Sequence, residues 1–464
     1  MAEAKQIQAL EQERIPRLLF NYAVPAVVGT VVNSLYNIVD RIFIGQGVSE
    51  YALSGLAITF PILLFLQAFG MLVGAGASVR VSILLGQRNT PRAEQTLANA
   101  VYLTLVTQIL TIIPCYIYME PLLRLFGASD RTLPYAVEYL RIVIPANFFA
   151  AFSFGYNAIM RASGYPRKAM TTMLLSALIN VVLDYIFIYP LGMGIRGAAI
   201  ATAIAMVICA VYVLAHFFLP GSVVRFRRAA FRPSWAIVRA ITAIGIAPFA
   251  MQLTGSAVNV LMNRSFVAYG TTPEESDLAI GAFGIISSYA MLIVMLILGV
   301  AQGMQPIVGF NYGARHMHRV RMAYAYSAGT NLFFSFVGFA VAMLYPRAIV
   351  SLFTTSEPLI ALCTTALRIG IMGVSLIGFQ ITTTQLFQSI GFSRLAIFLS
   401  LTRQLIFLAP ALLILPRFLG LDGVWWSLPV SDMAAVGVAV VLIFSRWKLL
   451  EGTEAKTADA LPEE

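Results

Sequence analysis

Apolar runs recur along the whole chain, from Leu18 to Phe444, and this pattern limits its fold more than any other feature. A membrane-spanning helix needs about 20 mostly apolar residues, and the runs have that length. Of the 464 residues 59% are hydrophobic and 11% are charged, whereas a soluble domain is about 25% charged. No polar block between the runs is long enough to fold independently. The sequence therefore predicts one polytopic membrane protein.

Charged, glycine and proline residues divide the runs into twelve candidate spans. They cover residues 17–40, 52–79, 93–119, 135–160, 169–189, 195–219, 236–268, 278–311, 320–345, 360–389, 395–416 and 423–446.

Basic residues lie unequally on the two sides of these spans. Of the 31 Lys and Arg, 21 fall on the side of both termini, 7 on the opposite side and 3 within spans. Because cytoplasmic loops carry an excess of Lys and Arg, both termini are predicted to be cytoplasmic, in a multi-pass protein of the inner or plasma membrane. The net charge of +10 is then a topology signal, and no nucleic-acid partner is expected.

The two halves of the span region resemble each other. An offset of 223 relates DRIFIGQG at 40–47 to NRSFVAYG at 263–270. Beyond a longer outer loop, an offset of 227 relates residues 86–88 to 313–315 and Gly164 to Gly391. Copies with an even number of spans are related by an axis along the membrane normal, which favours a transporter with a site between the halves.

The predicted fold class is therefore all-α, with twelve transmembrane helices in two six-helix lobes. The N-lobe is expected at 17–219 and the C-lobe at 236–446. Three polar segments are expected in the cytoplasm: 1–16 as a short surface helix, 220–235 as the inter-lobe loop and 447–464 as a tail.

Two aspartates lie within predicted spans of the N-lobe, where a charged group costs about 2.5–3.5 kcal/mol. Asn33, Tyr36, Asn37 and Asp40 share one face of the first span, and Asn180 and Asp184 share one face of the fifth. Asp184 lies ~24 Å above Lys168 at about 1.5 Å per residue. Asp40 is expected at the outer end of the first span, with Tyr139 and Thr202 near the outer ends of the fourth and sixth.

These side chains are predicted to form one cluster in the outer half of the N-lobe. Such a cluster can hold a proton between its acids or coordinate Na⁺ through oxygen. The repeat places Asn263 opposite Asp40, and Ala411 within one residue of the position opposite Asp184. Only the N-lobe keeps an acidic pair, which favours a function for it. The alternative is that Asp40 is an interfacial residue paired with Arg41.

A second acidic residue within a span is Asp432 in the twelfth, for which Arg403 in the eleventh is the expected partner. This C-lobe ion pair is either structural or part of the coupling. Polar and adaptable side chains facing the other lobe are candidate substrate contacts, with helix packing as their alternative role. They are Asn33, Tyr36, Asn37, Gln252, Ser256, Asn259, Met291, Gln380, Thr384 and Gln388.

Three segments carry a family resemblance: LYNIVDRIFIG at 35–45, INVVLDYIFIYPLGMGIRGAAIAT at 179–202 and QPIVGFNYGA at 305–314. They resemble the multidrug and toxic compound extrusion (MATE) family, in its MepA-like and DinF-like branch. The resemblance implies a secondary active multidrug antiporter that exports cationic or amphipathic small molecules in exchange for H⁺ or Na⁺ by alternating access. No cofactor other than the coupling ion is expected, and the protein is expected to be a monomer in contact with membrane lipid.

The resemblance also implies site residues. The cation site would comprise Asp40, Tyr139, Asn157, Asn180, Asp184 and Thr202, and Na⁺ would be held by Asp40, Asn180, Asp184 and Thr202. Pro25 would be the hinge of the first helix. The NorM-like branch has acidic residues on its seventh and tenth helices, where this chain has Gln252 and the uncharged stretch 378–386.

Two rival functions fit the sequence less well. A lipid-linked precursor flippase of the same superfamily needs cationic groups inside its cavity, and here most Arg residues lie in loops or at span ends. An intramembrane enzyme needs a catalytic set such as HExxH, and the only histidines, His216, His316 and His318, lie at cytoplasmic span ends or in loops. No enzymatic activity is therefore expected.

Overall fold

The computed structural model describes residues 2–354, 356–447 and 450, and this part of the chain forms helices without strands. Within it, eleven helices are long and apolar enough to cross a membrane, or twelve if two helices joined at a 47° bend count as one span. The predicted all-α, twelve-helix fold class is confirmed.

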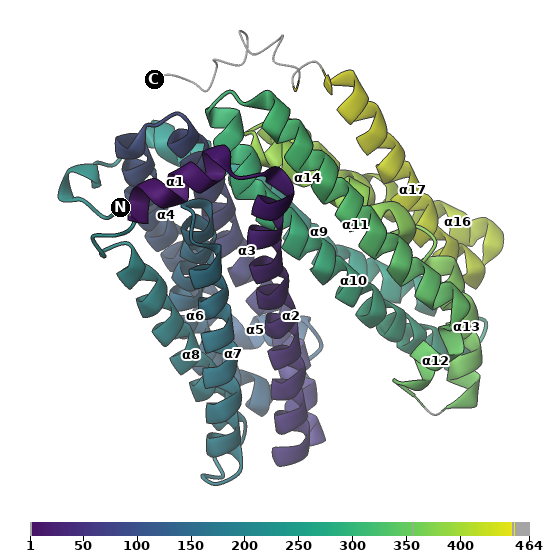
Figure 1. The fold of residues 1–464 in the computed structure, drawn as a ribbon. Coiled ribbons are helices and arrows are strands. Elements are labelled where there is room, and N and C mark those ends of the chain that lie inside the picture. The colour runs from purple at the N-terminus through teal and green to yellow at the C-terminus, as the bar shows by residue number, and fades with distance from the viewer. Residues whose placement is uncertain (1, 355, 448–449, 451–464) are drawn as a thin grey trace.

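Two bundles make up the molecule (Figure 1). The N-lobe contains α1 (Ala2–Gln12), α2 (Ile15–Gly47), α3 (Glu50–Gly86), α4 (Thr90–Ile117), α5 (Met119–Leu125), α6 (Leu133–Ala162), α7 (Pro166–Ile188) and α8 (Gly194–His216). The 3₁₀ turn η1 (Arg228–Ala230) lies in the connection to the second bundle. The C-lobe contains α9 (Trp235–Tyr269), α10 (Pro273–Gly313), α11 (Met317–Leu344), α12 (Pro346–Ser351), α13 (Glu357–Gly370), α14 (Val374–Ser389), α15 (Ser393–Leu401), the π-helical segment η2 (Thr402–Leu408), α16 (Ala409–Leu419) and α17 (Leu421–Ser445).

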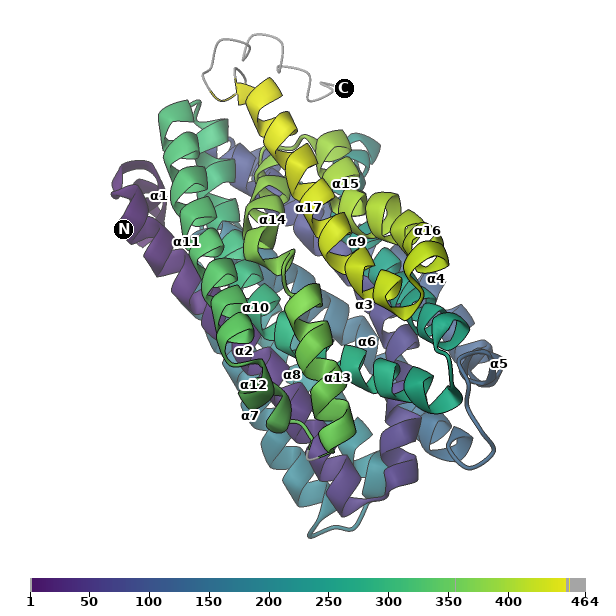
Figure 2. The ribbon, with the colours of Figure 1, turned by 90° about the vertical axis from the view of Figure 1, so that its right-hand side faces the viewer.

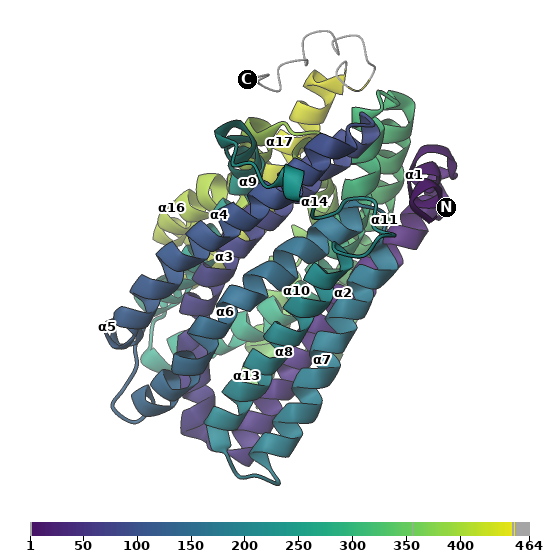
Figure 3. The same cartoon turned by 90° about the vertical axis from the view of Figure 1, so that its left-hand side faces the viewer.

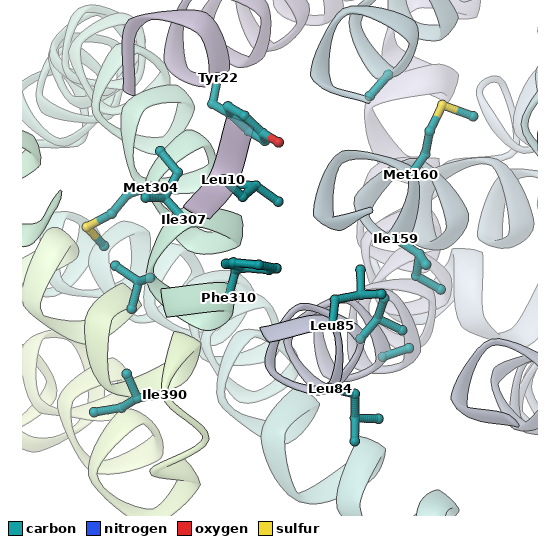
Figure 4. Close-up of a cluster of buried hydrophobic side chains, with 14 of the residues drawn as sticks. Leu10, Tyr22, Leu84, Leu85, Ile159, Met160, Met304, Ile307, Phe310 and Ile390 are labelled. Atoms are coloured by element: carbon teal, nitrogen blue, oxygen red, sulfur yellow. The ribbon is translucent and has the colours of Figure 1, made fainter. Parts of the chain in front are cut away.

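The bundles converge at one end and diverge at the other (Figure 1). We call the end that carries α1 and the end of α17 the terminal side, and the other end the distal side. At the terminal side one buried apolar cluster joins the lobes: Leu10 and Tyr22 pack with Ile307 and Phe310 (Figure 4). Toward the distal side each lobe has its own core, with buried residues drawn from 44–199 in one and from 258–425 in the other. Figure 2 shows the C-lobe facing the viewer and Figure 3 shows the N-lobe, each with the other lobe behind it.

The sequence repeat reappears in the backbone. Left-handed φ angles occur at Arg88 (58°) and Arg315 (61°), and again at Gly164 (99°) and Gly391 (82°), both pairs separated by 227 residues. The two short helices α5 and α12 also begin 227 residues apart. The predicted offset is thereby confirmed.

The pseudo-two-fold axis passes between α3 and α10. Ser78 and Gln305 are repeat-related, and the Gln305 amide donates to the Ser78 hydroxyl across the lobes at 3.3 Å. A Cβ on Gly86 would overlap the carbonyl oxygen of Phe310, and a Cβ on Gly313 would overlap that of Ile83, which is the same contact generated by the repeat. Glycine lets the two helix backbones approach this closely.

The structure corrects several predicted boundaries. Helix α2 does not end at Asp40 but continues to Gly47, ~10 Å further along its axis. A charged residue does not end a helix, and the Arg41 side chain extends over the Phe60 ring. The tenth span is broken at 371–373, between α13 and α14, and the eleventh contains the π-helical turn. The predicted cytoplasmic tail at 447–464 lies, apart from residues 447 and 450, outside the described residues.

Candidate cation site in the N-lobe

Two aspartates from different helices meet in the distal half of the N-lobe. Asp40 on α2 and Asp184 on α7 are 8% and 0% exposed, and their carboxyl groups lie within hydrogen-bonding range of each other. Neither carboxylate can donate, so that bond forms only when one of them carries a proton. Among the described residues, Oδ1 of Asp40 and both carboxyl oxygens of Asp184 have no donor.

Three further polar residues complete the cluster. On α7, Asn180 lies one turn before Asp184, and its Nδ2 donates to Oγ1 of Thr202 on α8 at 3.2 Å. The buried Tyr139 side chain of α6 lies beside the same Thr202. Helices α2, α6, α7 and α8 thus bring together Asp40, Tyr139, Asn180, Asp184 and Thr202, the group that the depth argument had predicted.

The cluster has an excess of acceptors. Oδ1 of Asn180 also has no donor among the described residues, so four buried oxygens of Asp40, Asn180 and Asp184 are unpaired. Buried polar atoms are nearly always paired, because an unpaired one costs about 1–3 kcal/mol. A proton shared by the acids, or a hard cation with oxygen ligands, would satisfy them. The donor set therefore fits H⁺ or Na⁺.

The structure does not bring Asn157 into this cluster. Asn157 lies near the terminal end of α6, where its Nδ2 donates to the carbonyl oxygen of Ala169 at 2.7 Å. It is eighteen residues along the helix from Tyr139, ~27 Å at about 1.5 Å per residue. The two side chains lie on one face because eighteen residues make five turns, but they are far apart in depth. Asn157 instead ties α6 to the start of α7.

Several candidate substrate residues lie where α2 and α10 diverge. The Thr30 hydroxyl donates to the carbonyl oxygen of Met295 at 3.3 Å and joins these helices. One or two turns further toward the distal side, Asn33, Asn37 and Met291 are exposed. Tyr36 on the same helix α2 is half-buried. On α9, Gln252 is half-buried, Asn259 is exposed and donates to the carbonyl oxygen of Gly255, and the side chain of Ser256 lies outside the described residues.

Three other candidates are packed inside the C-lobe. Gln380, Thr384 and Gln388 on α14 are all less than 10% exposed. The Gln380 amide donates to the carbonyl oxygen of Leu399 at 3.0 Å, next to the π-helical segment where the α-helical pattern of bonds is interrupted. Gln380 therefore joins α14 to α15, and all three side chains are buried instead of exposed between the lobes in this conformation.

The expected C-lobe ion pair is present. Nε of Arg403, in the π-helical segment, lies 2.9 Å from Oδ1 of Asp432, whose side chain is 7% exposed. Sequence reasoning missed Gly373, at the break between α13 and α14, where any Cβ would overlap the Asp432 side chain. The signal available was a glycine in the middle of the predicted tenth span.

Removing one partner of this pair should destabilise the protein. Arg403→Ala leaves a buried carboxylate unpaired, which costs about 3–5 kcal/mol for a fully buried pair and less here, about 2 kcal/mol, because Arg403 is 31% exposed. The double variant Arg403→Gln/Asp432→Asn keeps a hydrogen bond without charge and should regain most of the Tm in detergent. A double variant that is stable but inactive in transport would assign the pair to coupling, and a stable and active one would assign it to structure.

A model of the MatE family matches residues 25–186 and 240–413, which is most of the span region and both lobes. The chain belongs to the MATE family of membrane transporters. Multidrug export protein MepA of Staphylococcus haemolyticus is 25% identical over 441 residues, covering 95% of this chain and 96% of that protein.

Solved structures of MATE transporters have the same architecture. The outward-facing conformation of a multidrug resistance MATE family transporter matches with a TM-score of 0.89 and 27% identity over 97% of this chain and 99% of that one. A MOP superfamily transporter from Pyrococcus furiosus, for which the reverse polarity of the binding pocket suggests a different function, matches with a TM-score of 0.90, 27% identity and the same coverage. The resemblance to the MATE family noted in the sequence is confirmed, as is the assignment to transporters and not to enzymes.

Proposed function

We propose that this MATE transporter is a secondary active multidrug antiporter that exports cationic or amphipathic small molecules in exchange for H⁺ or Na⁺. Four unpaired oxygens in the Asp40–Asp184 cluster are the observation that carries this proposal. The MepA relatives, which are multidrug export proteins, support the substrate class. We further place the terminal side in the cytoplasm of the plasma membrane, on the distribution of basic residues, and take the monomer as the functional unit.

In this scheme the cluster takes up the coupling ion while the lobes diverge on the distal, external side. The ion neutralises the acidic pair and pairs the oxygens that otherwise lack donors. An ion can shift the balance between two conformations only by binding one of them more tightly. The ion-loaded cluster must therefore be more stable in the inward-open arrangement than in this one.

Helix α2 links the ion to the drug in this mechanism. It carries Asp40 in the cluster and also Asn33 and Asn37, which are exposed where α2 and α10 diverge. Pro25 lies within the same helix and has no N–H, so the carbonyl of Asn21 lacks its helical partner and bending there breaks no bond. Bending at Pro25 on ion binding would move the substrate face and release the drug outward.

Transport in proteoliposomes tests the proposal. A cationic fluorophore should move against its gradient when either a pH gradient or a Na⁺ gradient is imposed separately, and the active gradient identifies the coupling ion. A control with the ionophore that collapses that gradient should abolish transport. Failure of both gradients to drive the fluorophore, combined with stabilisation of the protein by a lipid pyrophosphate, would replace this function with the flippase alternative.

A further inference from the structure

Helix α1 lies over the N-lobe at the terminal side (Figure 1), and its carboxyl end also contacts the C-lobe. Leu10 is 1% exposed and belongs to the apolar cluster shared with Ile307 and Phe310 of the C-lobe (Figure 4). The predicted surface helix is thus anchored by a buried residue. On its other side, Glu11 forms a salt bridge with Arg88 of the N-lobe at 3.0 Å.

The carboxyl end of α1 is capped by an arginine of the C-lobe. Nη2 of Arg319, on α11, donates to the carbonyl oxygens of Leu10 and Glu13 at 3.1 and 2.8 Å. Nε of Arg319 donates to Oδ1 of Asn311 at 2.8 Å, and the Asn311 amide donates to Leu10 in turn. Carbonyls in the last turn of a helix lack partners within it and interact favourably with a cation. Here that cation comes from the opposite lobe.

The connection to the N-lobe is short. Only Glu13 and Arg14 separate the end of α1 from the start of α2. When α2 moves away from α11, so short a connection cannot stretch. Either the bonds from Arg319 break or α1 pivots away from the N-lobe, so opening of the terminal side disrupts this cap or the packing beneath it.

The inter-lobe connection provides a built-in comparison. It precedes α9 as α1 precedes α2, and it is held by the repeat counterpart of α11, namely α4. The fully buried Asn99 of α4 donates to the carbonyl of Arg232 at 3.1 Å and accepts from the N–H of Ser234 at 2.8 Å. Ser234 directly precedes α9, so these bonds, like those of Arg319, join one lobe to the first helix of the other lobe without slack between them.

We propose that α1 is a latch: its hydrogen bonds to Arg319 hold the terminal side closed while the distal side is open. The latch sets how often the transporter reaches the inward-open state. It adds a conformational control to the transport cycle proposed above, and it rests on the lobes moving and not on the identity of the ion or the drug.

Distances between spin labels on Arg167→Cys and Arg394→Cys test the latch. These exposed, repeat-related positions begin α7 and α15 on the two lobes, and the buried Cys115, Cys209 and Cys363 would be replaced by alanine. Arg319→Ala should increase the ratio of long to short distances on the order of fivefold, and Arg319→Lys, which keeps the charge but not the fork of donors, by less. Asn99→Ala, which removes the corresponding bonds before α9, should also raise the ratio. Tyr165→Phe is the matched control, because it removes a hydrogen bond to Gly221 that does not join the lobes, and it should leave the ratio unchanged.

The outcomes separate the latch from the transport proposal. An unchanged distance distribution in folded Arg319→Ala would overturn the latch, whatever the transport assay shows. An equal shift in Tyr165→Phe would also overturn it, since it would mean that any loss of bonds at this side opens the lobes. Because the labels report on conformation, a protein that moves neither H⁺ nor Na⁺ can still pass or fail this test.

Discussion

Asp40→Asn and Asp184→Asn should each reduce gradient-driven efflux to the rate of passive leak. Each substitution removes a group that gains a proton or binds Na⁺. An ion that binds two conformations equally well cannot shift the equilibrium between them. The loss is expected to be on the order of 100-fold in proteoliposomes. Asp130→Asn is the matched control, because Asp130 is 88% exposed and forms a surface pair with Arg124.

Stability separates this loss from misfolding. In Asp184→Asn the new amide can donate to Oδ1 of Asp40, which now lacks a donor among the described residues. The Tm of this variant should therefore equal or exceed that of the wild type. Full efflux activity in both folded variants would contradict the assignment of the cluster to coupling and favour the interfacial role of Asp40 beside Arg41.

Gly86→Ala and Gly313→Ala should each disfavour the conformation described here. A methyl group at either position would overlap a backbone carbonyl oxygen of the opposite lobe, which cannot move without separating α3 from α10 at the terminal side. Overpacking of this kind costs about 1–3 kcal/mol, so the ratio of terminal-open to terminal-closed molecules should rise about 5- to 150-fold. Spin-label distances between the lobes measure that ratio.

The repeat relation between the two positions, and a glycine with free space around its Cα, supply the controls. Because the two contacts are related by the offset of 227, the two variants should have similar effects, and the double variant a larger one. Gly329→Ala places its methyl in open space on α11 and should leave the distances unchanged while stabilising the helix by about 0.5–1 kcal/mol. Unchanged distances in both Gly86→Ala and Gly313→Ala would mean that the lobes separate without breaking this contact.

The sequence predicted the helices better than it predicted their interruptions. Apolar length and flanking charges locate the spans because water and lipid act on every residue directly. The break near Gly373 and the π-helical turn around Arg403 cannot be predicted in this way, because each depends on how Asp432 of another helix packs against it. Helix α2 likewise passes Asp40 and Arg41 without stopping, since neighbouring helices accommodate both side chains.

The candidate site divides in the same way. Asp40, Tyr139, Asn180, Asp184 and Thr202 could be placed at one depth because helix rise converts sequence distance into height. Sequence distance does not fix which side of a helix its neighbours cover, so the predicted cavity residues Gln380, Thr384 and Gln388 are instead buried where other helices pack against α14. Asn157 was assigned by resemblance alone, and the helix rise itself puts it at another depth.

The sequence by itself determined the membrane class, the number of spans, the duplication and the acidic pair, because periodicity, charge and depth are properties of single helices. Only the tertiary structure decided which oxygens in the cluster lack donors, where the lobes touch, and that Arg319 caps α1 across the lobe boundary. Those features arise from pairs of residues hundreds of positions apart, and such pairs are fixed only when the lobes pack.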